Sequence, residues 1–274
     1  MRPTTRRALR SAHGTALLAA VLTAACAGEK TPEEADPVME SPAAIVRLLE
    51  GGQPVFGIFS GDHTPEQGAV MVQNRETDFV FYSLESGPFD IPAMEAYMQG
   101  MADGAGEYAP HPVALRIPPI RDDREAAPGR VRRGLDAGVD VIVFPHVESA
   151  EEAALAVSSM GSNVWPAVPN GRYVNLLIIE DQVGIANARE IVATPGVSIV
   201  FPGPGDLRRA YERDMAAVEN AIQTVLAACK EFDVPCGITA GVDDIGKRLE
   251  QGFRVIIVTA PEALAVGRAA AGRN

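Results

Sequence analysis

The sequence predicts a (β/α)8 TIM barrel, and three observations lead to that fold. Short segments rich in Val, Ile and Leu alternate with segments of helical periodicity from residue 41 onward. This alternation is typical of a parallel sheet with helices between its strands. Eight strand–helix pairs follow one another, and the 274 residues are enough for a barrel, which uses about 250. An open, doubly wound sheet is the alternative, but residues 57–61 (Gly-Ile-Phe-Ser-Gly) lack the glycine fingerprint expected there.

Each predicted element follows from a local pattern. An N-terminal helix is predicted over 41–50, because Pro42 lies in its first turn and Gly51 and Gly52 end it. The remaining helices and strands follow from the spacing of apolar residues and from Gly or Pro at their ends. Strands are predicted over 55–59, 79–84, 113–117, 139–144, 174–179, 197–201, 236–239 and 253–258, and the helices that follow them over 65–72, 91–101, 130–137, 149–160, 184–192, 215–232, 243–251 and 261–271.

The first residues of the chain have the pattern of an export signal. An apolar segment over 15–22 is too short to cross a bilayer as a stable helix, and it follows a basic segment with arginines at positions 2, 6, 7 and 10. Small residues directly before Cys26 resemble the cleavage site of bacterial lipoproteins, so residues 1–25 are predicted to be a signal peptide and Cys26 to carry lipid. An ordinary cleaved signal and an uncleaved anchor are the alternatives.

The residues after Cys26 support this prediction. Residues 27–39 are acidic, contain proline and have almost no apolar side chains, so 26–40 is expected to be a flexible tether to a barrel over 41–274. The protein is therefore expected to be an exported lipoprotein that faces the periplasm or the cell exterior. In such a compartment Cys229 and Cys236 could form a disulfide, although buried free thiols are equally ordinary.

The charge of the chain excludes some classes of partner. The formal net charge is −12, and no basic cluster appears in the predicted barrel. Binding to nucleic acid is therefore not expected, and contact with a membrane is expected only through the lipid anchor.

Two acidic residues, Glu180 and Asp206, stand at the ends of consecutive predicted strands. The carboxyl ends of barrel strands carry the active site, so the two carboxylates are expected to bind one divalent cation, with Mg²⁺ preferred and Mn²⁺ or Co²⁺ acceptable. Between them Gly203 and Gly205 predict a shaped turn whose backbone N–H groups could approach an anion. A pair of solvated acids is the alternative.

Arg116 lies within an otherwise apolar strand, where an arginine is costly unless it is paired. Its planar fork suits a carboxylate or an enolate oxygen. An internal ion pair, for example with Glu85, is the alternative, and both could hold at once.

These residues resemble the class II, metal- and pyruvate-dependent aldolases of the HpcH/HpaI aldolase/citrate lyase family from about residue 44 to 271. The resemblance rests on Ile179-Glu180, on the turn 203–207 (Gly-Pro-Gly-Asp-Leu), on Arg116 and on residues 144–153. It implies that Glu180 and Asp206 bind a metal that holds pyruvate. It also implies that Arg116 helps to stabilise the enolate and that Gly203, Gly205 and Asp206 hold the pyruvate carboxylate.

The chain departs from the family at two places. The family's second strand ends in Asp-x-Glu-His, where the His is the general acid/base. Here Glu85 is kept near the substrate site, but Ser83 and Ser86 replace the other two residues. The segment between the fourth and fifth strands, residues 161–172, is short and lacks the family's motif, which leaves substrate range and a possible homo-oligomer open.

His63 and His146 each follow a predicted strand end, so either could replace the missing base. For each, a surface or structural histidine is the alternative. Two functions remain open at this point. The first is a metal-dependent carbon–carbon lyase acting on a small 2-oxo acid through a pyruvate enolate. The second is a membrane-tethered protein on an aldolase scaffold that binds a metal–oxo-acid complex without turning it over.

Overall fold

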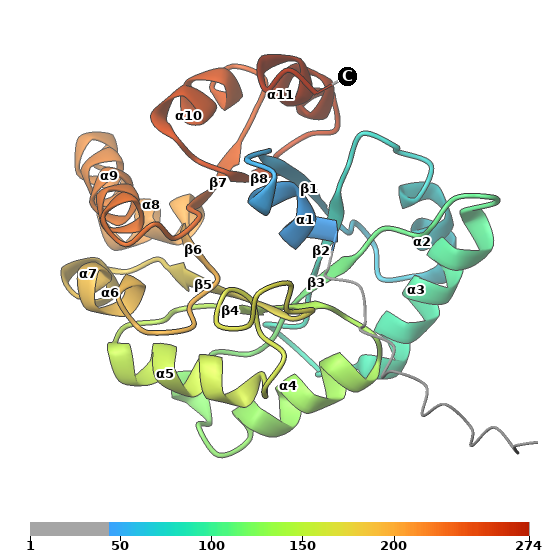
Figure 1. Ribbon diagram of the computed structural model, residues 1–274, viewed down its shortest axis with the longest axis horizontal. Coiled ribbons are helices and arrows are strands. Elements are labelled where there is room, and N and C mark those ends of the chain that lie inside the picture. The colour runs from blue at the N-terminus through green and yellow to red at the C-terminus, as the bar shows by residue number, and fades with distance from the viewer. Residues whose placement is uncertain (1–43, 274) are drawn as a thin grey trace, which may run out of the picture. The chain divides into compact units, whose positions relative to one another are not determined.

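Eight parallel strands form one sheet that curves into a ring (Figure 1), as predicted. The structure, a computed structural model, describes residues 44–273, so the predicted signal peptide, lipidated Cys26 and the whole predicted tether lie outside the described residues. The order of the strands around the ring is β6-β5-β4-β3-β2-β1-β8-β7. A single isolated bridge between Val200 and Cys236 joins β6 to β7 and closes the ring. The strands are β1 (Val55–Phe59), β2 (Phe79–Ser83), β3 (Val113–Arg116), β4 (Val141–Phe144), β5 (Val174–Ile179), β6 (Ile199–Pro202), β7 (Gly237–Ala240) and β8 (Val255–Val258).

Helices surround the ring and connect its strands (Figure 1). The predicted helix over 184–192 is divided at Asn187, and the predicted turn at 203–206 is the start of a helix, because Pro204 has the fixed φ that suits a first helical position. The helices are α1 (Ala44–Glu50), α2 (Pro65–Met71), α3 (Ile91–Gly104), η1 (Ile120–Asp122), α4 (Ala127–Asp136), α5 (Ala150–Ser159), α6 (Gln182–Ala186), α7 (Ala188–Val192), α8 (Pro204–Ala210), α9 (Met215–Glu231), α10 (Ile245–Gln251) and α11 (Glu262–Ala270).

The core has two layers because successive side chains of a strand point to opposite faces. The outer layer lies between strands and helices, and the inner layer fills the barrel. In β3, Ala114 belongs to the inner layer, so Arg116, two residues later, also faces the barrel axis. The same alternation from Ile178 places Glu180 at the mouth of the barrel. The period of the strands thus directs both predicted site residues inward.

The opposite end of the barrel is closed by apolar side chains. Ile45 and Val46 of α1 and the ring of Trp165 pack into the inner layer. The indole Nε1 of Trp165 donates a hydrogen bond to Glu50 Oε1 at 2.9 Å, which fixes α1 to the segment before β5. The predicted site can therefore open only at the carboxyl ends of the strands.

Cys229 and Cys236, for which the sequence left a disulfide open, are buried free thiols.

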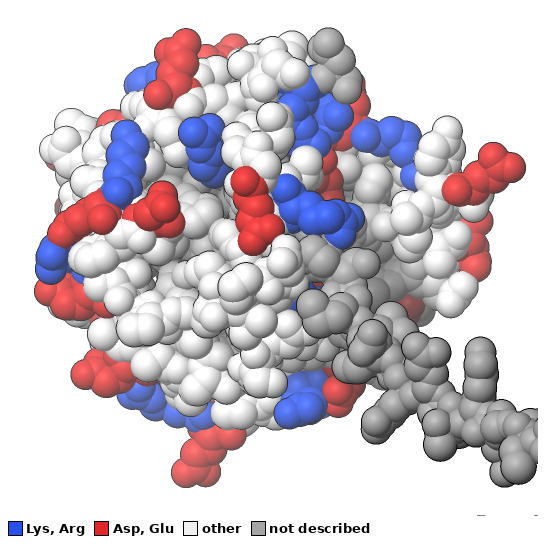
Figure 2. Space-filling view, in the orientation of Figure 1, with Lys and Arg blue, Asp and Glu red and all other residues white. Residues whose placement is uncertain are grey.

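The surface of the barrel carries charges of both signs. Figure 2 shows one face on which basic and acidic side chains are interspersed around the edge, with uncharged surface between them. None of the helices between residues 44 and 273 combines the length and the apolar content that a bilayer crossing needs.

The end of the chain is fastened to the start of the barrel by a buried ion pair. Arg273 binds both carboxylate oxygens of Asp78, at 2.6 and 2.7 Å, and Asp78 also accepts from the N–H of Phe56 at 2.8 Å. A bidentate pair with this burial holds the last helix against β1 and β2.

We expect Asp78→Ala to lower the free energy of unfolding by about 2–4 kcal/mol, because it leaves the guanidinium of Arg273 buried and unpaired. Urea unfolding measures this change. The matched control is Glu231→Gln, which removes the exposed ion pair with Arg189 and should change stability little. Equal effects of the two substitutions would contradict the role given to Asp78.

Candidate active site

The carboxyl ends of the strands surround a cavity of ≈ 480 Å³. Five of the predicted site residues line it: Arg116 from β3, Glu180 after β5, and Gly203, Gly205 and Asp206 after β6. A cavity of this size, with a few polar groups in apolar surroundings, is typical of a small-molecule site. Its apolar wall consists of Phe59, Phe81, Ile178, Phe201 and Ile257.

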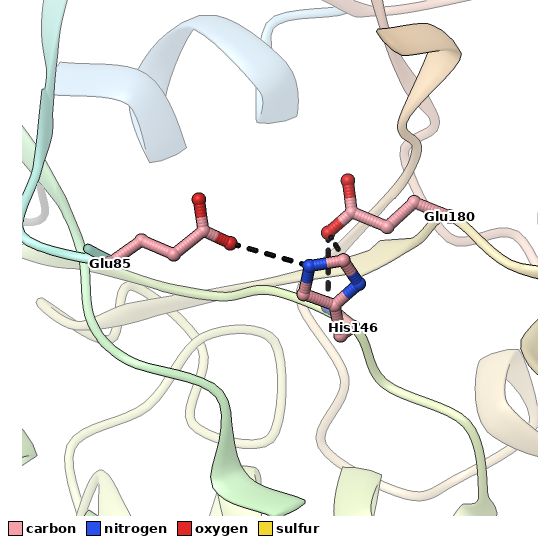
Figure 3. Close-up of side chains that lie close together, drawn as sticks. All are labelled: Glu85, His146 and Glu180. Carbon is pink, nitrogen blue, oxygen red and sulfur yellow. Dashed lines mark hydrogen bonds and ion pairs between the residues drawn. The ribbon is translucent and has the colours of Figure 1, made fainter. Parts of the chain in front are cut away.

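His146 lies between two carboxylates at this mouth (Figure 3). Its Nε2 is 3.6 Å from Glu85 Oε1, and its Nδ1 is 3.5 Å from Glu180 Oε1. One ligand atom from each of the three residues falls within 4.8 Å of the others, so these residues could hold a metal ion. The sequence places the three residues after β2, β4 and β5, far apart in the chain, and the barrel brings them together.

The backbone around His146 is held in a special conformation. His146 has a φ of 53°, in the left-handed region that non-glycine residues seldom adopt. In this conformation its N–H donates to Glu180 Oε1 at 3.1 Å. The following residue, Val147, donates to the carbonyl of Ile178 at 3.0 Å, which ties the loop to β5. The side-chain Nδ1 is buried and has no hydrogen-bond partner among the described residues.

Arg116 is fixed from two sides. Its Nη2 is 3.0 Å from Glu85 Oε2, and its Nε donates to Ser83 Oγ at 2.9 Å. The guanidinium also lies over the ring of Phe81, 5.3 Å from the centroid. The predicted ion pair with Glu85 is therefore present. Ser83 and Glu85 together orient the guanidinium, which lines the cavity.

Glu180 is almost completely buried, with 3% of its surface exposed. Burial first, and then the neighbouring carboxylate of Asp206, raises the pKa of Glu180 to about 8. Asp206 forms an ion pair with Arg209, one turn later in α8. A divalent cation would relieve both causes of the raised pKa, so this donor set fits the metal that the family resemblance implies.

Gly203 is required by the approach of Glu180. A Cβ atom at position 203 would lie 2.4 Å from Glu180 Oε2, which is far inside van der Waals contact. The helix α8 starts here without a side-chain cap, and among residues 44–273 no group accepts from the N–H of Gly205 or Asp206. These N–H groups belong to the first turn of a helix and not to the predicted turn, and backbone N–H groups in that position can bind anions.

His63 lies apart from this cluster. Its exposed ring stacks on Tyr82 at 3.9 Å between centroids, and Tyr82 belongs to the outer layer of the core. Burial lowers the pKa of His63, and Asp62 partly opposes that shift. Ser86 is exposed in the loop after β2. Of the two candidate bases, the structure brings only His146 to the predicted metal ligands.

Sequence reasoning missed part of the site. It gave no role to Arg208, Asp244 or Thr259, which also line the cavity. The second of two arginines after the Gly-Pro-Gly-Asp-Leu turn pairs with Asp206, and the first, Arg208, reaches the cavity. That distinction depends on the helical start of α8, which was predicted as a turn.

We expect the affinity for Mn²⁺ to rise with pH up to about 8, by up to about tenfold per unit, because protons compete with the metal for Glu180. The free energy of unfolding without metal should fall as the pH rises. The raised pKa of Glu180 stabilises the folded state most below the ordinary pKa of 4.5, and this contribution is lost as the pH rises through about 8. Calorimetry and thermal unfolding measure the two effects. A pH-independent Mn²⁺ affinity, or the same melting profile in Glu180→Gln, would contradict the assignment.

Comparison with known proteins identifies the family of the chain. A sequence model of the HpcH/HpaI aldolase/citrate lyase family matches residues 74–260. A hydroxypyruvate/pyruvate aldolase of Delftia acidovorans is 29% identical over 238 residues, covering 77% of this chain and 83% of that protein. A 5-keto-4-deoxy-D-glucarate aldolase of Salmonella gallinarum is 31% identical over 189 residues, covering 56% and 74%.

The fold also matches that of solved structures. The crystal structure of a family protein from Burkholderia cenocepacia J2315 aligns with a TM-score of 0.67 at 24% identity, covering 82% of this chain and 95% of that one. The family match extends over more than half of the sequence. The chain therefore belongs to the HpcH/HpaI aldolase/citrate lyase family.

Proposed function

We propose that the protein is a divalent-metal-dependent carbon–carbon lyase that acts on a small 2-oxo acid through a pyruvate enolate. The observation that carries the proposal is the position of Arg116 in one cavity with the carboxylates of Glu180 and Asp206. Membership of an aldolase/citrate lyase family and two related aldolases support the reaction class.

The roles of the residues follow from their chemistry. Glu180 and Asp206 would hold the metal, and their oxygen ligands favour Mg²⁺ or Mn²⁺. When bound, the metal supplies a positive charge that stabilises an enolate oxygen. The free N–H groups of Gly205 and Asp206 would hold the carboxylate of the oxo acid. Arg116, fixed by Glu85 and Ser83, points its remaining donors at the developing oxyanion.

His146 is the group we propose for proton transfer. In the cleavage direction it would take the proton of the 4-hydroxyl group while the bond between C3 and C4 breaks. The 4-oxygen becomes the carbonyl oxygen of the released aldehyde, the bonding electrons form the enolate, and C3 then takes the proton from His146 to give pyruvate. His146 has the position for this step, because its ring lies between Glu85 and Glu180 at the cavity. Glu85, which follows β2, would support the imidazole of His146, which follows β4.

The alternative is a tethered protein that binds the metal–oxo-acid complex without turnover. The feature in its favour is Ser86, which the sequence resemblance places at the position of the family's acid/base, because a serine cannot transfer a proton near neutral pH. Calorimetric binding of oxalate with Mn²⁺, together with no pyruvate release from any substrate, would support this alternative.

We expect pyruvate release from 4-hydroxy-2-oxo acids in the presence of Mg²⁺, Mn²⁺ or Co²⁺, and a loss of about 10²–10³-fold in kcat/KM in Arg116→Lys. Lysine keeps the charge but loses the fork that Glu85 and Ser83 orient. A coupled assay for pyruvate measures the rates. No release with any of the three metals, over several chain lengths of substrate, would overturn the lyase proposal.

We expect His146→Gln to lower kcat by about 10²–10⁴-fold, as is typical for the loss of a general acid/base. KM should change much less, because the groups proposed to bind the oxo acid remain. His63→Gln is the matched control. His63 follows β1 at the same end of the barrel, but its ring stacks on Tyr82 and does not line the cavity. The rate of this variant should therefore stay close to that of the wild type. The reverse result would assign proton transfer to His63.

A further inference from the structure

The loop after β4, residues 145–149, places His146 at the mouth of the barrel in a backbone conformation that non-glycine residues seldom adopt. The φ of His146 is 53°, and such a backbone persists only where surrounding contacts restrain it. One restraint is the hydrogen bond from the N–H of Val147 to the carbonyl of Ile178 in β5. The position of His146 therefore also depends on what holds the rest of this loop.

Arg121, in the short helix η1 after β3, contacts this loop and the loop after β5 with a single nitrogen. Its Nη1 forms an ion pair with Glu148 Oε1 and lies 3.3 Å from Asp181 Oδ2. Glu148 stands two residues after His146. Asp181 directly follows Glu180. One guanidinium thus joins the segment that carries the proposed acid/base to the segment that carries a proposed metal ligand.

The two acids would repel each other without this cation. Burial first, and then a hydrogen bond with Asp181 and its charge, raises the pKa of Glu148, and Arg121 partly opposes that shift. Two carboxylates therefore share one positive charge between the loops after β4 and β5. Removal of Arg121 would leave like charges facing each other there, and their repulsion would favour separation of the two loops.

Both acids are also fixed to the segment after β5, so the two ion pairs act on the backbone. Asp181 uses its other oxygen, Oδ1, to accept the N–H of Gly184 at 2.8 Å, and it caps α6 in this way. The carbonyl of Glu148 accepts from Asn187 Nδ2 at 2.8 Å. A Cβ atom at position 184 would lie 2.8 Å from the carbonyl oxygen of Val147, so α6 packs directly against the loop after β4. This loop is therefore held by both η1 and α6.

We infer that Arg121 is a positioning residue for the proposed site. Through its two ion pairs it holds the loops of His146 and Glu180 in one arrangement. The inference rests on the proposed function, because it takes His146 to transfer a proton and Glu180 to bind the metal. Arg121 does not line the cavity, so it acts only through these loops. Its side chain is 35% exposed, so its ion pairs should contribute little to the stability of the whole barrel.

The first test is amide hydrogen exchange of the full chain without metal or substrate, which does not depend on turnover. We expect Arg121→Gln to raise the exchange rate of peptides that cover residues 144–149 by about 3–10-fold, because two ion pairs no longer restrain the loop. Peptides from β1 and β8 should exchange as in the wild type. Arg121→Lys should restore the slow exchange, because one ammonium group can replace the single nitrogen that contacts both acids.

The matched control is Arg189→Gln. It also removes one positive charge and one ion pair, the exposed contact with Glu231 that joins α7 to α9. Exchange of residues 144–149 should stay as it is in the wild type, because this ion pair does not contact the loop after β4.

The second test is the rate of pyruvate release. We expect Arg121→Gln to lower kcat by about 10-fold, because a small displacement of the group that transfers the proton slows the reaction. KM should change little, since the groups proposed to bind the oxo acid remain, and Arg121→Lys should recover most of kcat. The midpoint of thermal unfolding should match that of Arg189→Gln, whereas a purely structural role would lower it.

The outcomes separate the inference from the proposed function. Unchanged exchange of residues 144–149 in Arg121→Gln, an equal rise in Arg189→Gln, or an equal rise in β1 and β8 would overturn the inference. Faster exchange of residues 144–149 with an unchanged kcat would also overturn it, because the restraint would then not position the acid/base. Absence of pyruvate release from the wild type would overturn the proposed function, and the exchange experiment would still decide whether Arg121 restrains the loop.

Discussion

The buried carboxylate of Glu180 is the constraint on which the rest of the site depends. It stands at the mouth of a barrel that excludes water from its axis, and the neighbouring Asp206 adds a second charge. Such an arrangement is expensive unless a cation or a set of donors accompanies it. The protein supplies one donor by bending the backbone of His146 into the left-handed region, and it makes room by placing Gly203 where any side chain would collide with the carboxylate. The loop after β4 and the start of α8 are thus both shaped around one acid.

A continuous line of ionisable side chains runs across the mouth from that acid. Glu180 faces His146, His146 faces Glu85, and Glu85 pairs with Arg116. Each of the four residues stands at the end of a different strand, so they come together only in the folded barrel. Because Glu85 contacts both the imidazole and the guanidinium, a change at Arg116 would disturb the position of His146 as well. The effects of substitutions along this line are therefore not expected to add.

The fold and the identity of the strand-end residues could be predicted because they depend on local patterns. The apolar periodicity of β3 and β5 directs Arg116 and Glu180 to the same side of the sheet, and parallel strands bring their ends together. The function of His146 could not be ranked above that of His63, since both follow strand ends and only the three-dimensional path of each loop separates them. Helix α8 was missed because its first residues, Gly-Pro-Gly, usually mark a turn.

The joint between β6 and β7 gives the barrel an uneven stiffness. Seven of the neighbouring strand pairs are joined by ladders, and this pair by a single bridge at Val200 and Cys236. The start of α8 follows β6, and Thr239 belongs to β7. Both line the cavity, so the cavity lies over the strand pair that has the fewest hydrogen bonds. A ligand that contacts both α8 and β7 would link the two strands and reduce the local separation of β6 from β7. The mouth would then be widest when empty and would take its final shape only around its occupant.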